Sequence, residues 1–583
     1  MLAWLKRYFT LTIVAKSPNE LMVERSLFLL SIGRDSYLRL GCWVFSRWWL
    51  LFASCITTFF AGSLLAFDSL AESLDLHFST QDSNHLAAYA LCCFAAVAFL
   101  SAPYFERQGP RFAMFIGSVL VATGFALSYL AVQSGHYTFL LLGHCGFTAS
   151  GFGILVISAI STAQKWFPDL RGVVAGLATA LGLSGYALFD AWYAFIASKP
   201  PSSHLTRVFL TSGLWISSGL FIASLVLRTP PPTFSIRGYD MHRVPLSRAP
   251  YPTYTQSKFL QNGLTCINFG AVAEELEASY CSHILPFSSR VDSDDEFYKI
   301  GMTLIDHAIL ESHSSRFQPL YKQQRKAMSL LGCFFSSDLI ALAVSAACLL
   351  LPVQILVLQA HDISRNLFQS ALPPALVLAT GVAGAIASSF FSDALICILY
   401  STSAQARKIV LEILLCLQLV ALLLVAVNAS NSVVFRVALS VVSFTGSGTL
   451  ALLPAMITDL FGVFHTGPIY SFVLLPCVAQ ALLGGVVKTP LTPDALLHQV
   501  HWMLGLTTAS AVALVIVRPR ADDRFFHGYQ YTAFGKTLLS RPIRTAARDT
   551  CLDDSVAMMD VGGLSYSYPP EEASAIWHAI KDV

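Results

Sequence analysis

Long apolar stretches alternate with short polar turns along most of this chain. Each stretch is long enough to cross a bilayer, because a hydrocarbon core about 30 Å thick needs about 20 residues of helix. Unpaired backbone groups are costly in lipid, so we expect every span to be helical. The pattern predicts an all-α integral membrane protein with 12 transmembrane helices in two blocks of six. The first block is Trp48–Phe67, Leu86–Tyr104, Phe112–Val132, Tyr137–Ala163, Gly172–Ala197 and Arg207–Leu227, and the second is Leu330–Val357, Ser370–Leu395, Ile409–Val427, Val433–Ile457, Thr466–Val487 and Trp502–Val517.

Polar segments separate and flank the two helical blocks. Composition agrees with a membrane protein, since 55% of the 583 residues are hydrophobic and 12% are charged. Such a chain has too little polar surface for a soluble globule. We divide it into an N-terminal segment (1–47), a first six-helix bundle (48–228), a central linker that we expect to be largely irregular (229–327), a second six-helix bundle (328–518) and a C-terminal tail (519–583).

Lysine and arginine collect on one set of loops. They occur in the N-terminal segment, in the turns near residues 107, 165 and 407, in the central linker and in the tail. Loops with this bias usually stay in the cytosol. We therefore expect both termini and the linker to be cytosolic, in a protein of the plasma membrane or of an internal organelle membrane.

Two turns repeat a pattern in the two halves of the chain. Trp166-Phe-Pro-Asp-Leu-Arg-Gly172 precedes the predicted fifth helix, and Asp459-Leu-Phe-Gly-Val-Phe-His-Thr-Gly467 precedes the eleventh. Both open helices rich in small residues, which let helix backbones approach closely. Ordinary membrane packing is the alternative for any single glycine. The matching turns favour an internal duplication and hence two pseudo-symmetric bundles.

The turn after the second predicted helix carries a known signature. It reads Ala102-Pro-Tyr-Phe-Glu106-Arg107-Gln-Gly109-Pro-Arg111. This resembles the G-x-x-x-D-R-x-G-x-R/K motif of the major facilitator superfamily, with Ala in place of the first Gly and Glu in place of Asp. The two repeated turns are most similar to those of its nodulin-like, monocarboxylate and oxalate/formate branch. The resemblance implies the major facilitator fold and a central cavity lined by the first, fourth, seventh and tenth helices.

The charged turns are candidates for a gate on the cytosolic side. A carboxylate and two guanidinium groups at a helix junction can bond in one packing of the bundles and separate in another. The alternative is a solvated turn worth less than about 1 kcal/mol. The turn after the eighth helix keeps Ser389 and Asp393 but lacks the Arg and Gly, so we expect the first half to carry most of the gating. The predicted gating residues are Glu106, Arg107, Gly109, Arg111, Arg171, Gly172, Asp459 and Gly467.

Ionisable residues inside the bilayer are costly and usually functional. Asp338 approaches mid-membrane if the seventh helix starts at Leu330, and is an interfacial cap if it starts nearer Phe335. His144, in the fourth helix, is a candidate for proton coupling because histidine titrates near neutral pH. Its alternative role is a satisfied core histidine.

Three uncharged side chains and one arginine complete the candidate binding residues. Arg436, at the outer end of the tenth helix, would attract an anion or extend to the interface. Tyr186, Gln480 and Tyr470 would add hydrogen bonds. The eighth predicted helix contains no Lys or Arg, and Lys488 closes the eleventh at its outer end. A simple organic anion is thus weakly supported, and the nodulin-like members of the branch fit better.

We interpret the chain as a secondary carrier of a small solute, with or without a co-transported proton, that works by alternating access. It lacks a GxxxxGK[S/T] signature, so a gradient rather than ATP would drive it. No catalytic or metal-binding constellation stands out, so we expect no enzyme activity, cofactor or metal. The net charge of +2 implies no nucleic-acid partner. We expect a monomer in lipid. The alternative is a non-transporting sensor or scaffold that acts through the linker and tail.

The even number of predicted spans makes a prediction about topology. Epitope tags placed at the N-terminus and at the C-terminus should be protected or exposed together in sealed vesicles, because 12 crossings return the chain to its starting side. Antibody accessibility before and after permeabilisation measures this. Tags on opposite faces would contradict the topology.

Overall fold

The computed structural model describes most of the helical part of the chain and short pieces outside it. The chain forms two compact units, Met1–Thr265 with Met328–Pro519, and Cys266–Ala327 with Arg520–Val583. The expectation of an irregular central linker lies largely outside the described residues. These are 8–9, 23–24, 26–31, 37–79, 86–197, 203–231, 234–236, 239–240, 330–369, 374–399, 402–486, 492–519, 528–533, 536–542, 557–561 and 564–568.

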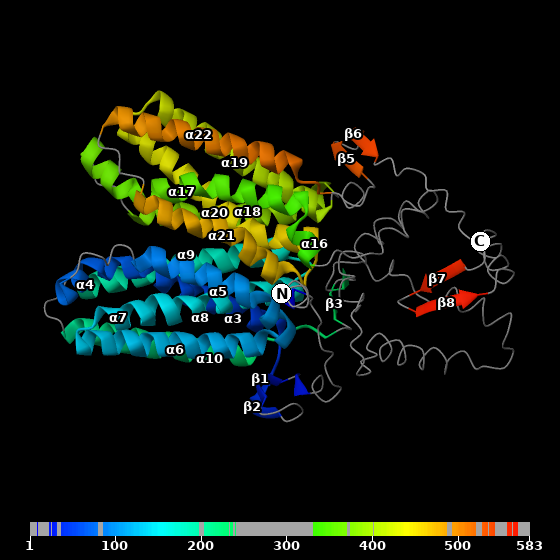
Figure 1. Cartoon of the computed structure of the whole chain (residues 1–583), viewed down its shortest axis with the longest axis horizontal. Helices are drawn as coiled ribbons and strands as arrows, with labels where there is room; N and C mark the ends of the chain where they lie inside the picture. Colours follow the sequence, from blue (N-terminus) through cyan, green and yellow to red (C-terminus); the bar gives the residue numbers. More distant parts are fainter. Residues whose placement is uncertain are drawn as a thin grey trace. The chain divides into compact units, whose positions relative to one another are not determined.

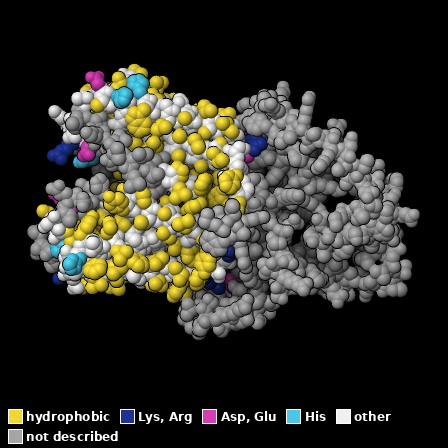
Figure 2. Space-filling view, viewed as in Figure 1, with side chains coloured by type: hydrophobic (Ala, Val, Ile, Leu, Met, Phe, Trp, Pro, Cys, Tyr) yellow, Lys and Arg dark blue, Asp and Glu magenta, His cyan; other side chains and the backbone are white. Residues whose placement is uncertain are grey.

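The first unit contains both helical bundles, which are drawn in blue to cyan and in green to orange in Figure 1. Among the described residues, 11 helices are long and apolar enough to cross a membrane, and α21 occupies the remaining predicted span. The predicted all-α membrane fold of two six-helix bundles is confirmed. Hydrophobic side chains cover the visible face of the bundles, and charged side chains appear near the two ends (Figure 2).

The helices of the first bundle follow the predicted order. A single span runs through α3, a 3-10 turn and α4, and another runs through α7, a π-helical segment and α8. The bounds are α3 Arg47–Leu65, the 3-10 turn Ala66–Leu70, α4 Ala71–Phe78, α5 Leu86–Gln108, α6 Pro110–Ser134, α7 Tyr137–Leu140, the π-helical segment Leu141–Thr148, α8 Ala149–Trp166, α9 Arg171–Ala197 and α10 Ser203–Val226.

Helices of the second bundle differ from the prediction mainly at their ends. Ser336 accepts a hydrogen bond from Leu339 N and starts α17, so this helix begins later than Leu330. Thr492 caps α22 in the same way, ahead of the predicted start at Trp502. The bounds are α16 Leu330–Phe334, α17 Ser337–Phe368, α18 Pro374–Leu399, α19 Ser403–Val427, α20 Ser432–Phe461, α21 Thr466–Val486 and α22 Pro493–Ile516.

Short antiparallel hairpins lie outside the bundles. One precedes α3, one follows α10, and two belong to the tail, for which the sequence pattern predicted no strands. The strands are β1 Ser26–Ser31 with β2 Tyr37–Val44, β3 Ser235–Ile236 with β4 Tyr239–Asp240, β5 Gly528–Ala533 with β6 Lys536–Pro542, and β7 Ala557–Val561 with β8 Leu564–Tyr568.

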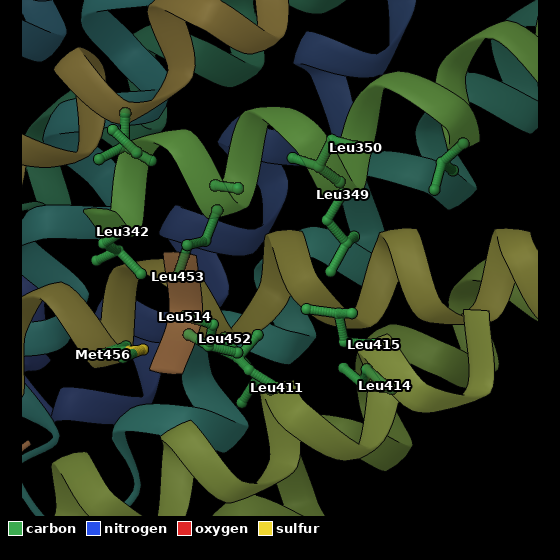
Figure 3. Close-up of a cluster of buried hydrophobic side chains, with 14 of the residues drawn as sticks. Leu342, Leu349, Leu350, Leu411, Leu414, Leu415, Leu452, Leu453, Met456 and Leu514 are labelled. Atoms are coloured by element: carbon green, nitrogen blue, oxygen red, sulfur yellow. The ribbon is translucent and has the colours of Figure 1, made fainter. Parts of the chain in front are cut away.

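Leucine side chains fill the interior of the second bundle (Figure 3). Leu349 and Leu350 of α17 lie near Leu415 of α19, and Leu452 of α20 lies near Leu411. These side chains are buried, so apolar packing holds α17, α19 and α20 together. A separate cluster of buried apolar residues fills the first bundle.

One end of the helical unit carries the turns that join α5 to α6, α8 to α9, α18 to α19 and α20 to α21. We call this end the linker face, because α10 ends and α16 begins there. The other end is called the opposite face. The predicted gating residues all belong to the linker face.

Helices α3 and α9 cross in very close contact. A Cβ added to Gly185 of α9 would stand 1.9 Å from the carbonyl oxygen of Phe59 in α3. A Cβ on Gly62 of α3 would stand 2.3 Å from the backbone nitrogen of Tyr186. The two backbones can approach this closely only because glycine occupies both positions.

A substitution at this crossing should therefore destabilise the first bundle. We expect Gly185→Ala to lower the free energy of unfolding by about 2 kcal/mol, because the backbone of α3 must move. Thermal unfolding in detergent measures the change. Gly505→Ala in α22 is the matched control, since nothing lies within 4 Å of its added Cβ. Equal effects of the two substitutions would contradict the close contact.

Candidate functional site

A buried ion cluster joins the two bundles at the linker face. The Arg171 Nη1, in the first turn of α9, donates to Asp459 Oδ1 of α20 at 2.6 Å. Arg407 Nε of α19 donates to the other oxygen, Asp459 Oδ2, at 2.5 Å. Both arginine side chains are 0% exposed and the Asp459 side chain is 1% exposed. One carboxylate therefore bridges a guanidinium group from each bundle, in surroundings where an unpaired charge would be costly.

Asp393 of α18 extends this cluster to the start of α9. Its carboxylate accepts hydrogen bonds from the backbone nitrogens of Gly172 at 3.2 Å and Val173 at 2.9 Å. The first N–H groups of a helix have no partner within the helix and attract negative charge. Arg407 Nη1 also lies 3.2 Å from Asp393 Oδ1. A carboxylate of the second bundle thus caps a helix of the first, and a Cβ on Gly172 would clash with it at 2.7 Å.

Glu106 of α5 occupies the corresponding place in the first bundle. Its Oε1 pairs with Lys165 Nζ of α8, and its Oε2 accepts from Ser161 Oγ at 3.2 Å. A Cβ on Gly467, at the start of α21, would stand 3.3 Å from Glu106 Oε2. The ammonium of Lys165 lies 5.1 Å from the ring centroid of Phe464 in the turn before α21. This ion pair therefore abuts the second bundle, and it forms no salt bridge to the residues of that bundle that the structure describes.

A narrow crevice reaches this carboxylate. It is lined by Ser101, Phe105 and Glu106 of α5, Ser158 of α8 and Gly467 of α21, together with apolar residues of α5 and α8. Its volume of about 10 Å³ has room for about one water molecule. We call the two clusters, centred on Asp459 and on Glu106, the linker-face latch.

The latch draws on both bundles, and the expectation that the first half carries most of the gating stays a prediction. Its charged residues are divided equally between the bundles. Asp393, Arg407 and Asp459 belong to the second bundle, and Glu106, Lys165 and Arg171 belong to the first. The sequence pattern identified Asp393 as a residue kept in the turn after the eighth helix, and it used Arg407 only to orient the chain. Residues that are far apart in the sequence and pair across a helix junction leave no local pattern in the sequence. The available clue was Asp393, which is kept in the turn after the eighth helix.

The basic residues of the signature turn do not join the latch. Arg107 Nε donates to Pro103 O at 3.1 Å, and its guanidinium lies 5.4 Å from the ring centroid of Tyr8. Arg111 Nη2 lies 3.2 Å from Glu24 Oε1. Gly109 precedes α6 with a φ of +94°, a conformation that favours glycine. Both arginines thus contact the N-terminal segment.

Asp338 lies in the first turn of α17, at the linker face. It accepts hydrogen bonds from Arg518 N at 2.9 Å and from Arg518 Nη2 at 2.8 Å. Of the two alternatives that the sequence left open, this position is the interfacial one. A substrate or proton role for Asp338 stays a prediction that this geometry does not support.

His144 lies in the π-helical segment, a form that is rare and frequent at functional sites. Its ring is 2% exposed and stacks on Phe67 with centroids 3.6 Å apart. Its Nε2 has no hydrogen-bond partner among the described residues. The aromatic stacking places His144 in the core of the first bundle, and its coupling role stays a prediction.

The remaining candidates lie apart from one another in the described contacts. Arg436 donates to Ser432 Oγ of its own helix at 3.0 Å. Tyr470 is buried in α21, and Tyr186 is half-buried in α9. The side chain of Gln480 lies outside the described residues. Their proposed roles in solute binding stay predictions.

Comparison with known proteins finds short matches to two curated transporters. No family model matches the chain. It is 24% identical over 164 residues to the MFS-type transporter opdF of Penicillium oxalicum and 26% identical over 130 residues to the oxalate:formate antiporter of Oxalobacter formigenes. These matches cover 28% and 22% of this chain. The chain spans 38% and 29% of the lengths of these relatives.

Three solved structures are also similar. They are the E. coli fucose:proton symporter FucP (13% identity, TM-score 0.48), a bacterial homologue of the iron transporter ferroportin (12%, 0.47) and the human organic anion transporter MFSD10 (14%, 0.45). Each match covers 80% of this chain and 98%, 98% and 99% of the respective structure. At TM-scores below 0.5 these matches establish neither family nor function.

The buried cluster predicts the effect of breaking it. We expect Arg171→Ala to lower the free energy of unfolding by about 3 kcal/mol, because Asp459 loses a partner in a buried site. Asp459→Ala should cost more, since it leaves two guanidinium groups without their carboxylate. Denaturant unfolding in detergent measures both. Arg436→Ala is the control, because Arg436 is half-buried at the opposite face and bonds a serine of its own helix. If Arg171→Ala were as mild as this control, the cluster would not stabilise the observed arrangement.

Three observations indicate the same superfamily. They are the two six-helix bundles, the signature turn at Glu106–Arg111 and the matches to curated transporters. The oxalate:formate antiporter agrees with the branch indicated by the repeated turns. The chain is therefore similar to transporters of the major facilitator superfamily and of its oxalate–formate branch.

Proposed function

We propose that this protein is a gradient-driven transporter of a small solute that works by alternating access, with its linker face in the cytosol. The two bundles would rock about a central site and expose it to one side at a time. The matched relatives are named as transporters, one of them as an antiporter. The excess of Lys and Arg on the linker-face loops supports the orientation.

The linker-face latch is the observation that carries this proposal. Helix α9 packs on α18 and α20, and α5 packs on α21, so the two bundles meet along these pairs. Opening the linker face would separate Arg171 from Asp459 and uncap α9 from Asp393. Such contacts can be exchanged between two discrete packings of the bundles. The structure therefore corresponds to a state closed at the linker face.

The placement of buried cations bears on the solute. Lys165, Arg171, Arg407 and Arg518 are buried at the linker face, each paired with a carboxylate. They serve the latch and the ends of the bundles, so none of these four is available to neutralise an anion at mid-depth. We propose a small solute whose binding does not depend on a buried arginine of the described helices. Oxalate and formate appear in the name of the relative from Oxalobacter formigenes, and we do not assign them to this chain.

A reversible crosslink across the latch tests alternating access. Gly467 of α21 faces Ser161 of α8, and a Cβ on Gly467 would lie 3.6 Å from the Ser161 Cβ. This matches the separation of about 3.8 Å that a disulfide needs. We expect the Ser161→Cys/Gly467→Cys protein to form the disulfide on oxidation and to lose at least about 90% of its transport, because the bundles can no longer separate at this face. Reduction should restore transport.

The measurement needs a solute found by an uptake screen of a metabolite mixture in proteoliposomes with and without the protein. Each single cysteine variant, oxidised in the same way, controls for the 13 native cysteines. Undiminished transport in the crosslinked protein would reject rocking of the bundles about this face. If the screen found no solute for the native protein, and the isolated linker still bound a partner, the sensor or scaffold function would replace transport.

A further inference from the structure

The N-terminal segment reaches the boundary between the two bundles at Phe9. Its ring lies 6.4 Å from that of Phe99 in α5 and 5.6 Å from that of Phe334 in α16. Phe472 of α21 completes the group, 5.8 Å from Phe99 and 5.2 Å from Phe334. We call these four rings the aromatic bridge. One ring comes from the first bundle, two come from the second and one comes from the N-terminal segment.

Neighbouring contacts hold the N-terminal segment against the first bundle. Tyr8 lies beneath the guanidinium of Arg107, and its hydroxyl donates to the carbonyl oxygen of Leu100 in α5. Farther along the segment, Glu24 pairs with Arg111 at 3.2 Å. Both arginines belong to the signature turn, and each contacts a residue of this segment. The basic residues of the turn thus serve as a docking site for the N-terminus.

A buried arginine anchors the same segment at a second point. Arg228, just after α10, donates from Nη1 to Ser26 O at 2.9 Å and from Nη2 to Leu27 O. Its guanidinium lies 4.0 Å from the ring centroid of Phe45, and the residue is 2% exposed. The segment is therefore tied to the first bundle by several independent bonds. Among the described residues of the segment, Phe9 has a ring contact with the second bundle.

We propose that the N-terminal segment acts through Tyr8 and Phe9 as an autoinhibitory strap, in which Phe9 clamps α5 to α16 and holds the linker face closed. The strap rests on the proposed function, since it restrains the same opening. The latch supplies the charged contacts between the closed bundles, and the aromatic bridge supplies apolar contacts. One of the four rings of the aromatic bridge, Phe9, comes from the N-terminal segment rather than from either bundle. Opening moves α5 away from α21, and Phe9 cannot then contact both Phe99 and Phe334.

The strap implies a form of control. Arg107, Arg111 and Arg228 keep the described part of the segment on the first bundle during opening, so Phe9 is the described residue that must leave the second bundle to release the clamp. A partner or modification that withdraws Tyr8 and Phe9 from the surface would raise the fraction of open protein. The resting state is therefore the closed one.

Distances between spin labels test the strap without any solute. Labels at Gln108, the last residue of α5, and at Gln405, in the first turn of α19, report the separation of the bundles at the linker face. The protein is full-length, has its native cysteines replaced, and is placed in lipid nanodiscs. We expect Phe9→Ala to increase the population with the longer label distance about three- to ten-fold, as expected for the loss of two aromatic contacts. Phe9→Tyr should restore the native distribution, because it keeps the ring.

Phe335→Ala is the matched control, since this ring follows Phe334 in the chain but is 81% exposed. A Phe9→Ala distribution equal to that of the control would overturn the strap. If Phe9→Ala does not fold, Phe9→Leu serves instead, and a native distribution for it and for Phe334→Leu would also overturn the strap. Transport is scored separately. A shifted distance without flux of any solute supports the strap and rejects transport, whereas flux without any shift rejects the strap alone.

Discussion

The carboxylate of Asp459 must compensate two arginine side chains that are buried between the bundles. Arg171 approaches it from the first bundle and Arg407 from the second, and all three side chains are withdrawn from water. A buried charge that loses its partner is far more costly than an exposed one. The bundles can therefore separate at this face only if each group finds another partner or water, which makes the contact suited to two discrete states rather than to gradual opening.

The two halves share one arrangement of a carboxylate and a glycine, but the carboxylate has different bonding partners in each. In each, a carboxylate at the end of one helix faces a glycine at the start of a helix in the other bundle. Asp393 faces Gly172 and bonds its backbone nitrogen, whereas Glu106 faces Gly467 and pairs with Lys165 of its own bundle. The carboxylate approaches these helix starts closely because glycine has no Cβ. Duplication thus explains the shared geometry, and divergence of the partners explains why the stronger charged contact lies at Asp393 and Asp459.

The closed interface contains charged contacts in one place and apolar contacts in another. The ion cluster gives specificity, because it forms in one relative position of α9, α18 and α20. The aromatic bridge adds contact area at the neighbouring pair, α5 and α21, and brings the N-terminal segment into the same interface. His144 and Asp338, the two ionisable residues that stood out in the sequence, belong to neither. One stacks inside the first bundle and the other ties α17 to the end of α22.

Hydrophobic periodicity alone determined the number, order and approximate bounds of the helices, because lipid requires about 20 apolar residues for each span. The signature turn and the repeated glycines also identified where the bundles would meet. Tertiary structure alone decided which charges pair there. Asp459 and Arg171 are 288 positions apart, and Phe9 and Phe334 lie on opposite sides of the central linker. Nothing in local spacing encodes such pairings, since they depend on how the two bundles pack against each other.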